Sequence, residues 1–215
     1  MIINFIHIPK NGGTSIEEIC YNKSNTTSSL MTGTGGTLIY NGHHSDVYDK
    51  KLSNQLVIIR NPIDRFISAV YYAIQKWSHE PQIQYLISKN IDSPEKWVQV
   101  WSDPKHPDHN NLMSEMINKS HFIGNKRNKY KWTYSPQSLW INNPRFVIIM
   151  DNLNDEFQYF FKKYKIDSTL MEQKNSTYHK DDQLSVESIH FLRNFYKEDF
   201  ILYEKYKHMN IEERL

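Results

Sequence analysis

Short apolar runs alternate with amphipathic segments along this chain. Apolar residues dominate 2–8, 56–59 and 146–150, and these runs predict buried strands. The second and third runs are followed by apolar residues at helical spacing, over 62–74 and 153–164. Buried strands that alternate with helices indicate a central parallel sheet covered by helices on both faces. The pattern therefore predicts an α/β fold.

The remaining segments are more polar. A polar stretch at 26–37 predicts a flexible loop, and a short strand is expected at 38–40. Residues 77–135 are weakly patterned and predict helices and loops that form one wall of a substrate cleft. Ser185 is placed to cap the last long helix. Since neither a repeat nor a Pro- or Gly-rich linker divides the chain, we expect a single domain over 1–215, with 77–135 as an insertion.

The first apolar run ends at a turn suited to phosphate. Glycines let backbone N–H groups approach an anion, and the N-terminus of the following helix adds partial positive charge. A lysine adds a full charge, and two hydroxyl side chains add donors. The candidate residues are Lys10, Asn11, Gly12, Gly13, Thr14 and Ser15. The alternative is a tight strand-to-helix turn with an exposed lysine. In the Walker A pattern the lysine follows the glycines, so an ordinary P-loop match fails here.

A second candidate segment follows the run at 56–59. Arg60 ends that strand, and Pro62 suits the first position of a helix on which Ser68 lies two turns on. Open α/β sheets bind ligands at the carboxyl ends of their strands, so an arginine fork and a hydroxyl here could hold one phosphate. The alternatives are an ion pair between Arg60 and Asp64, and a helix-packing role for Ser68.

Together these segments resemble the sulfotransferases that use 3′-phosphoadenosine 5′-phosphosulfate (PAPS). Residues 7–15, His-Ile-Pro-Lys-Asn-Gly-Gly-Thr-Ser, look like the 5′-phosphosulfate loop of that family, and residues 60–72 look like its 3′-phosphate segment. The likeness is greatest to the carbohydrate-type, sulfotransferase family 2-like branch, whose loop usually has threonine at the position of Asn11. Residues 134–138 and 174–203 show a weaker likeness to later family segments, and 134–138 resembles a Pro-Gln segment.

The resemblance implies an enzyme that moves the sulfuryl group of PAPS to an acceptor hydroxyl, on a carbohydrate by likeness to that branch. It implies that the loop residues and Arg60 and Ser68 bind PAPS as co-substrate, with no metal required. Lys10 would meet the leaving oxygen. A histidine after the second strand often serves as base in related carbohydrate enzymes, and this likeness points to His43 first and His44 second.

Two other functions fit parts of the sequence. A P-loop-like nucleotide or small-molecule kinase would need ATP and Mg²⁺, and a non-catalytic glycan-binding protein could retain the fold. The acidic and histidine residues within 103–109 favour a solvated loop over a metal site. The basic, aromatic strip at 126–132 suits an acidic glycan or a solvated face equally.

Composition narrows these possibilities. The 215 residues carry a net charge of only +2, so anion binding must be local and a nucleic-acid partner is not expected. A single cysteine, Cys20, excludes an intrachain disulfide. Because neither a membrane span nor a signal peptide is recognisable, we expect a soluble, cytoplasmic protein. The oligomeric state cannot be inferred from the sequence.

Overall fold

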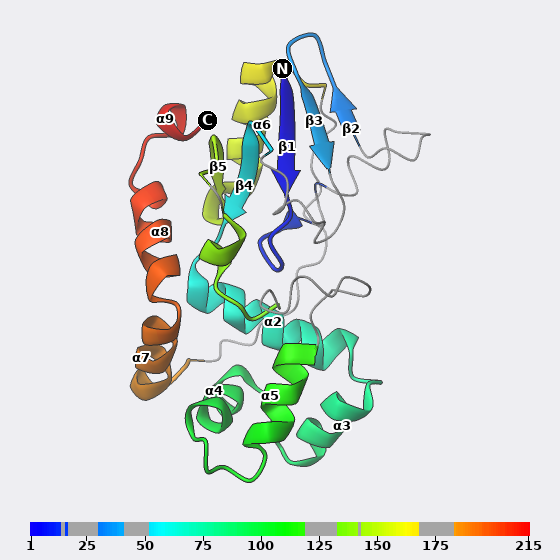
Figure 1. Ribbon diagram of the computed structural model, residues 1–215, viewed down its shortest axis with the longest axis vertical. Helices are drawn as coiled ribbons and strands as arrows, with labels where there is room; N and C mark the ends of the chain where they lie inside the picture. The colour runs from blue at the N-terminus through cyan, green and yellow to red at the C-terminus, as the bar shows by residue number, and fades with distance from the viewer. Residues whose placement is uncertain (14–15, 17–29, 41–51, 119–132, 142, 168–182) are drawn as a thin grey trace. The chain divides into compact units, whose positions relative to one another are not determined.

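A mixed sheet of five strands organises the part of the chain that the structure describes (Figure 1). The computed structural model describes residues 1–13, 16, 30–40, 52–118, 133–141, 143–167 and 183–215. The strands are β1 (Ile2–Ile6), β2 (Leu30–Thr32), β3 (Thr37–Tyr40), β4 (Gln55–Ile59) and β5 (Phe146–Ile149). Their order is β2-β3-β1-β4-β5, and only β2 runs antiparallel to its neighbour. The predicted α/β fold with a central, mostly parallel sheet is confirmed.

Two compact units share the chain, and each has its own hydrophobic core. The first contains the sheet and comprises residues 1–61, 137–176 and 201–215, and the second comprises residues 62–136 and 177–200. The segment 77–135 falls entirely in the second unit, together with α2 (Pro62–Lys76) and α7 (Val186–Phe195). A single domain with an insertion at 77–135 stays a prediction.

The prediction of a flexible loop at 26–37 is wrong for its described part. Leu30–Thr32 forms β2, which pairs antiparallel with β3. The hairpin turns through Gly33 and Gly36, whose backbone N–H and C=O groups bond at 2.9 Å. A Cβ at Gly33 would lie 1.9 Å from the Lys165 carbonyl oxygen, so a glycine is needed for this close approach. The strand depends on pairing with β3, which local polarity does not reveal.

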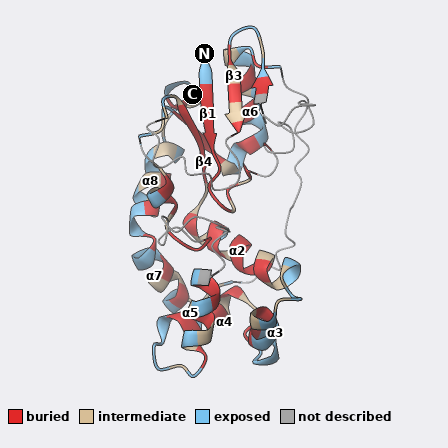
Figure 2. Ribbon diagram, turned by 45° about the vertical axis from the view of Figure 1, so that its right-hand side comes forward, coloured by how far each residue is buried: buried red, intermediate tan, exposed pale blue. Residues whose placement is uncertain are grey.

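The core of the first unit lies between the sheet and α6 (Leu153–Tyr164). All five residues of β4 are buried, as predicted for a strand covered on both faces (Figure 2). The predicted amphipathic helix is confirmed in α6, which places Phe157 and Phe160 in this core. The ring of Phe160 meets that of Phe146 on β5 edge to face, with centroids 5.6 Å apart.

A buried ion pair ties the last helix of the chain to β5. Arg214, at the end of α9 (Ile211–Arg214), donates through both terminal nitrogens to the Glu156 carboxylate, at 2.7 and 2.8 Å. The same carboxylate accepts the Ile149 backbone N–H at 2.8 Å, and the guanidinium also donates to the Val147 carbonyl oxygen at 3.1 Å. Removing either partner would leave a buried charge without its counterion, so the pair specifies how the C-terminal segment docks.

Helices are the regular elements of the second unit within its described residues. Its helices include α3 (Pro81–Ser88), α4 (Pro94–Ser102) and α5 (His109–Asn118), besides α2 and α7. They enclose a core that includes Phe66, Trp97, Trp101 and Leu192. The predicted cap at the start of α7 is confirmed, because the Ser185 hydroxyl accepts the Ser188 N–H at 3.1 Å. The expected last long helix is divided into α7, α8 (Lys197–Lys207) and α9.

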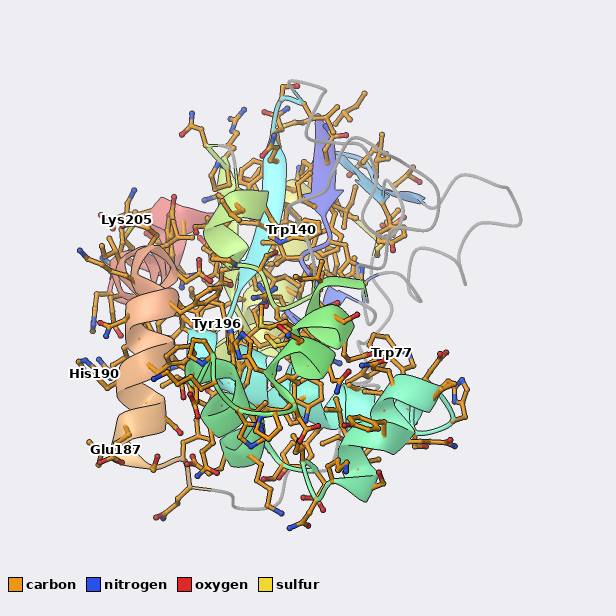
Figure 3. All side chains as sticks on the ribbon, turned by 60° about the horizontal axis from the view of Figure 1, so that its bottom comes forward. Trp77, Trp140, Glu187, His190, Tyr196 and Lys205 are labelled. Atoms are coloured by element: carbon orange, nitrogen blue, oxygen red, sulfur yellow. The ribbon has the colours of Figure 1, made fainter. Side chains whose placement is uncertain are left out.

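A buried arginine organises residues 133–135 within this helical unit. Arg65 on α2 is 1% exposed and donates to the Ser135 and Thr133 carbonyl oxygens at 2.8 and 2.9 Å. The Tyr196 hydroxyl donates to the Tyr134 carbonyl oxygen at 2.7 Å, and burial raises the pKa of Tyr196. Figure 3 shows Tyr196 pointing into the unit from the end of α7. These bonds hold the backbone that leads directly to Gln137.

The lengths of the described helices bear on whether one of them could span a membrane. The longest helix in this part of the chain is α2, with 15 residues, whereas a membrane-spanning helix needs about 20 apolar residues. Among the described residues we find no helix with the length and apolar content to cross a membrane. The cytoplasmic location stays a prediction.

Candidate active site

The turn after β1 has a backbone conformation suited to an anion. Lys10 and Gly12 have positive φ angles of 65° and 78°, whereas Asn11 between them and Gly13 after them do not. Alternation of left- and right-handed residues points successive N–H groups toward one concave face, which is the geometry of anion-binding nests. A bond of 3.3 Å from the Asn11 N–H to the Ile8 carbonyl oxygen closes the turn.

Lys10 is held in a conformation that lysine rarely adopts. A left-handed residue other than glycine costs about 1–3 kcal/mol and persists only where its surroundings enforce it. Here the Arg60 side chain donates to the Lys10 carbonyl oxygen at 3.1 Å. This bond holds the strained residue next to Arg60.

Both glycines of the turn are required by close packing. A Cβ at Gly13 would lie 2.2 Å from the His7 ring, and a Cβ at Gly12 would lie 2.7 Å from the sulfur of Met150. His7 is buried, and its Nδ1 lies 3.3 Å from the Tyr40 hydroxyl. His7, the residue after β1, therefore packs against the loop.

Arg60 reaches the loop because β1 and β4 are parallel neighbours. Their ladder ends with Ile6 opposite Val57, so the residues that follow both strands emerge at one edge of the sheet. Parallel α/β sheets bind ligands at this edge. The structure thus brings together Lys10, Gly12, Gly13 and Arg60 among the predicted site residues.

Asn11 lies in the same turn, but its side chain is directed into the protein. Its Nδ2 donates to the Ile58 carbonyl oxygen at 2.7 Å and to the Gln137 side-chain oxygen at 2.9 Å. Asn11 is 1% exposed, and its Oδ1 has no hydrogen-bond partner among the described residues. Its predicted role as a PAPS ligand rests on its position in the loop, whereas these contacts support the backbone.

Gln137 was not predicted as a site residue. It opens η2 (Gln137–Trp140) and is fully buried. Its Nε2 donates to the Arg60 carbonyl oxygen at 2.8 Å, and its Oε1 accepts the Arg60 backbone N–H at 3.2 Å. The only sequence signal was the resemblance of 134–138 to a family segment that contains Pro-Gln.

A hollow of about 270 Å³ lies next to the turn. It is lined by residues 150–155, which comprise η3 (Met150–Asn152) and the start of α6. The contacts of Gly12 with Met150 and Leu153 place this hollow beside the loop. Asp151, in η3, accepts the Tyr203 hydroxyl at 2.6 Å. Its carboxylate is thus bound to a side chain of the first unit.

The other predicted site residues are not part of this described cluster. Ser68 is buried on α2, in the second unit. Thr14, Ser15, His43 and His44 lie outside the described residues.

The acidic and histidine residues of 103–109 make contacts of their own. Asp108 accepts the Tyr85 hydroxyl at 2.6 Å, which raises the pKa of Tyr85. The His109 Nδ1 lies 3.0 Å from the Val100 carbonyl oxygen. Across the described part of the chain, no group of three or more Asp, Glu, His or Cys residues is arranged to hold a metal ion. The basic strip at 126–132 lies outside the described residues.

The first unit therefore presents a lysine, a turn with two left-handed residues and an arginine at one edge of a parallel sheet. This arrangement suits the binding of a phosphorylated or sulfated ligand. A search of curated protein sequences finds no match to this chain. A family model described as the sulfotransferase family matches residues 2–207. Because that match covers nearly the whole chain, the protein belongs to the sulfotransferase family and is a transferase.

Proposed function

We propose that the protein transfers a sulfuryl group from PAPS to a hydroxyl group of a carbohydrate. The observation that carries this proposal is the strained turn at Lys10, which is linked to Arg60 at the carboxyl edge of the sheet. In a chain of the sulfotransferase family, such a site suits a nucleotide donor that carries phosphate at both the 5′ and the 3′ positions of its ribose.

The loop would bind the 5′ end of PAPS. Gly12 and Gly13 let the turn pack closely against Met150 and His7, and the backbone N–H groups of the turn would bind the ligand. Lys10 would contact the oxygen that bridges sulfur and the 5′-phosphate. Negative charge grows on this oxygen as the sulfur–oxygen bond breaks, so the lysine would stabilise the transition state more than the bound donor.

Arg60 and Ser68 would bind the 3′-phosphate. A guanidinium presents several donors in one plane and suits a phosphate, and a serine hydroxyl adds one more donor. Arg60 follows β4, and Ser68 lies on α2, the next element along the chain. This pair would distinguish PAPS from ATP, which has a free 3′-hydroxyl.

The acceptor hydroxyl would lose its proton to a histidine. We propose His43 as the base and His44 as the alternative. The acceptor oxygen forms a bond to sulfur while the bond between sulfur and the 5′-phosphate oxygen breaks. The histidine takes the acceptor proton, and 3′-phosphoadenosine 5′-phosphate (PAP) leaves. Imidazole suits this step because its unperturbed pKa is about 6.5.

A carbohydrate acceptor is proposed from the resemblance of the loop to the carbohydrate-type branch. The scheme requires no metal ion. Lys10, the backbone N–H groups of the turn and Arg60 would neutralise the charge of the donor, which makes the proposal testable with the metal-free nucleotide.

Donor binding is tested by thermal unfolding with four ligands: PAP, adenosine 5′-phosphate, ATP with Mg²⁺, and a panel of glycans. A ligand at 100 times its Kd stabilises the native state by about 2.7 kcal/mol, or about 5–11 °C in a protein of this size. We expect PAP to raise the Tm far more than adenosine 5′-phosphate at equal concentration. Equal shifts would refute a 3′-phosphate site.

The same panel separates the alternative functions. Stabilisation by ATP with Mg²⁺ but not by PAP would favour a kinase, and stabilisation by glycans alone would favour a binding protein. Transfer of label from PAPS to polysaccharides, glycolipids, small alcohols or tyrosine peptides then identifies the acceptor class. Labelling of the peptides alone would refute the carbohydrate acceptor.

A further inference from the structure

We infer that Gln137 is a positioning residue that sets the spacing between the two phosphate-binding segments of the donor site. This inference rests on the proposed function, because it assigns the 5′ loop and Arg60 to the two ends of one donor. It concerns side chains that bind each other and the backbone rather than the ligand.

The Gln137 side chain binds both the N–H and the carbonyl group of the Arg60 backbone. Its Nε2 donates to the Arg60 carbonyl oxygen at 2.8 Å, and its Oε1 accepts the Arg60 N–H at 3.2 Å. A side-chain amide that pairs with both groups of one residue acts like the edge of a neighbouring strand. It therefore restrains both the position and the direction of the backbone that carries the Arg60 side chain.

The same Gln137 oxygen also accepts from the 5′ loop. The Asn11 Nδ2 lies 2.9 Å from Gln137 Oε1 and 2.7 Å from the Ile58 carbonyl oxygen. One buried oxygen thus joins a residue between Lys10 and Gly12 to the backbone N–H of Arg60. Gln137 and Asn11 are 0% and 1% exposed, so water does not compete for the bond between their side chains.

This network continues the connection between the strands beyond their ladder. The β1–β4 pairing ends at Ile6 and Val57, before either phosphate-binding segment begins. Past that point, two connections join the segments. Gln137 binds both the Asn11 side chain and the Arg60 N–H, and the Arg60 side chain binds the Lys10 carbonyl oxygen. If Gln137 sets this spacing, its loss should weaken binding of ligands that contact both ends more than binding of ligands that contact one.

The test compares Gln137→Met with Gln55→Met. Methionine resembles glutamine in length and removes both hydrogen-bonding groups. Gln55 is a matched control, because it lies at the amino end of β4, is 7% exposed, and donates to the Leu52 carbonyl oxygen at 3.2 Å. Calorimetry on the whole chain, well below the Tm of each variant, gives the Kd for PAP and for adenosine 5′-phosphate.

We expect Gln137→Met to raise the Kd for PAP by about 10–100-fold, the range for residues that orient direct ligands in metal sites. The Kd for adenosine 5′-phosphate should rise less, so that the preference for the 3′-phosphate falls. Gln55→Met should lower the Tm but preserve that preference. An unchanged preference in Gln137→Met, or an equal loss in Gln55→Met, would overturn the inference.

A double-mutant cycle with Asn11→Leu tests the link to the loop. Because the two side chains share one hydrogen bond, their effects on the Kd for PAP should be less than additive. Full additivity would refute the link. If Gln137→Met does not fold, Asn11→Leu alone should still reduce the preference for PAP, and no reduction would overturn the inference. If the parent protein does not bind PAP, the proposed function fails and this inference falls with it.

Discussion

Lys10 allows its charge and its backbone conformation to be tested separately. The proposed role needs the ammonium group, whereas the turn needs a residue that accepts a φ of 65°. Lys10→Ala removes the charge and retains the strain, and Lys10→Gly removes both. The two variants should therefore lose turnover equally but differ in stability.

The difference in stability follows from two opposing effects. A left-handed conformation costs an L-residue about 1–2 kcal/mol, which glycine avoids. Glycine also gains about 0.4–1 kcal/mol of conformational entropy in the unfolded chain, which offsets part of that gain. Lys10→Gly should thus be more stable than Lys10→Ala by about 0.5–1 kcal/mol, which urea unfolding can measure.

Turnover should fall by about 10²–10³-fold in both variants, by analogy with removal of one oxyanion donor. Lys165 provides a matched control, because it is also a lysine with positive φ, 48°, and lies at the end of α6. Lys165→Gly should exceed Lys165→Ala in stability, and both should retain turnover. Equal stability of the two Lys10 variants would refute the strain argument. A normal kcat with a raised KM in Lys10→Ala would refute the catalytic role.

Three further predictions concern Arg60, the proposed base and the buried ion pair. Arg60→Ala should weaken PAP binding by about 1.5–3 kcal/mol, measured by calorimetry, and an equal loss for adenosine 5′-phosphate would contradict a 3′-phosphate contact. His43→Ala should keep PAP binding and lose about 10²–10⁴-fold in turnover at saturating donor. His44→Ala should lose less turnover, because adjacent residues of an extended segment face opposite sides. The reverse result would make His44 the base, and full turnover in both variants would exclude both histidines. Arg214→Ala should lower the free energy of unfolding by about 3–5 kcal/mol, because the Glu156 carboxylate stays buried without its counterion. A loss below about 1 kcal/mol in urea unfolding would contradict that account.

Local sequence determined most of the regular elements of the first unit. The unbroken apolar run at 56–59 predicted β4, and the helical spacing after Leu153 predicted α6. The turn after β1 could be proposed as a phosphate site from the sequence, because lysine, glycine and hydroxyl residues after a strand carry their chemistry in their own side chains and backbone. Each of these features depends on residues that are close together along the chain.

Tertiary structure decided the features that depend on distant partners. β2 exists because it pairs with β3. Arg214 can be buried because it binds the Glu156 carboxylate, which is 58 residues away in sequence. Gln137 reaches Arg60 across 77 residues. Such contacts leave no periodic trace in the sequence, so a buried glutamine or arginine cannot be distinguished there from an exposed one.

The proposed donor site combines both kinds of information. The sequence by itself determined which residues carry charge and which glycines leave space at the turn. Only the folded chain decided that Lys10 is left-handed, that Asn11 points inward, and that Gln137 joins the loop to Arg60. The reason is physical: residue chemistry is local, whereas backbone strain and the burial of polar groups are imposed by partners that folding brings together.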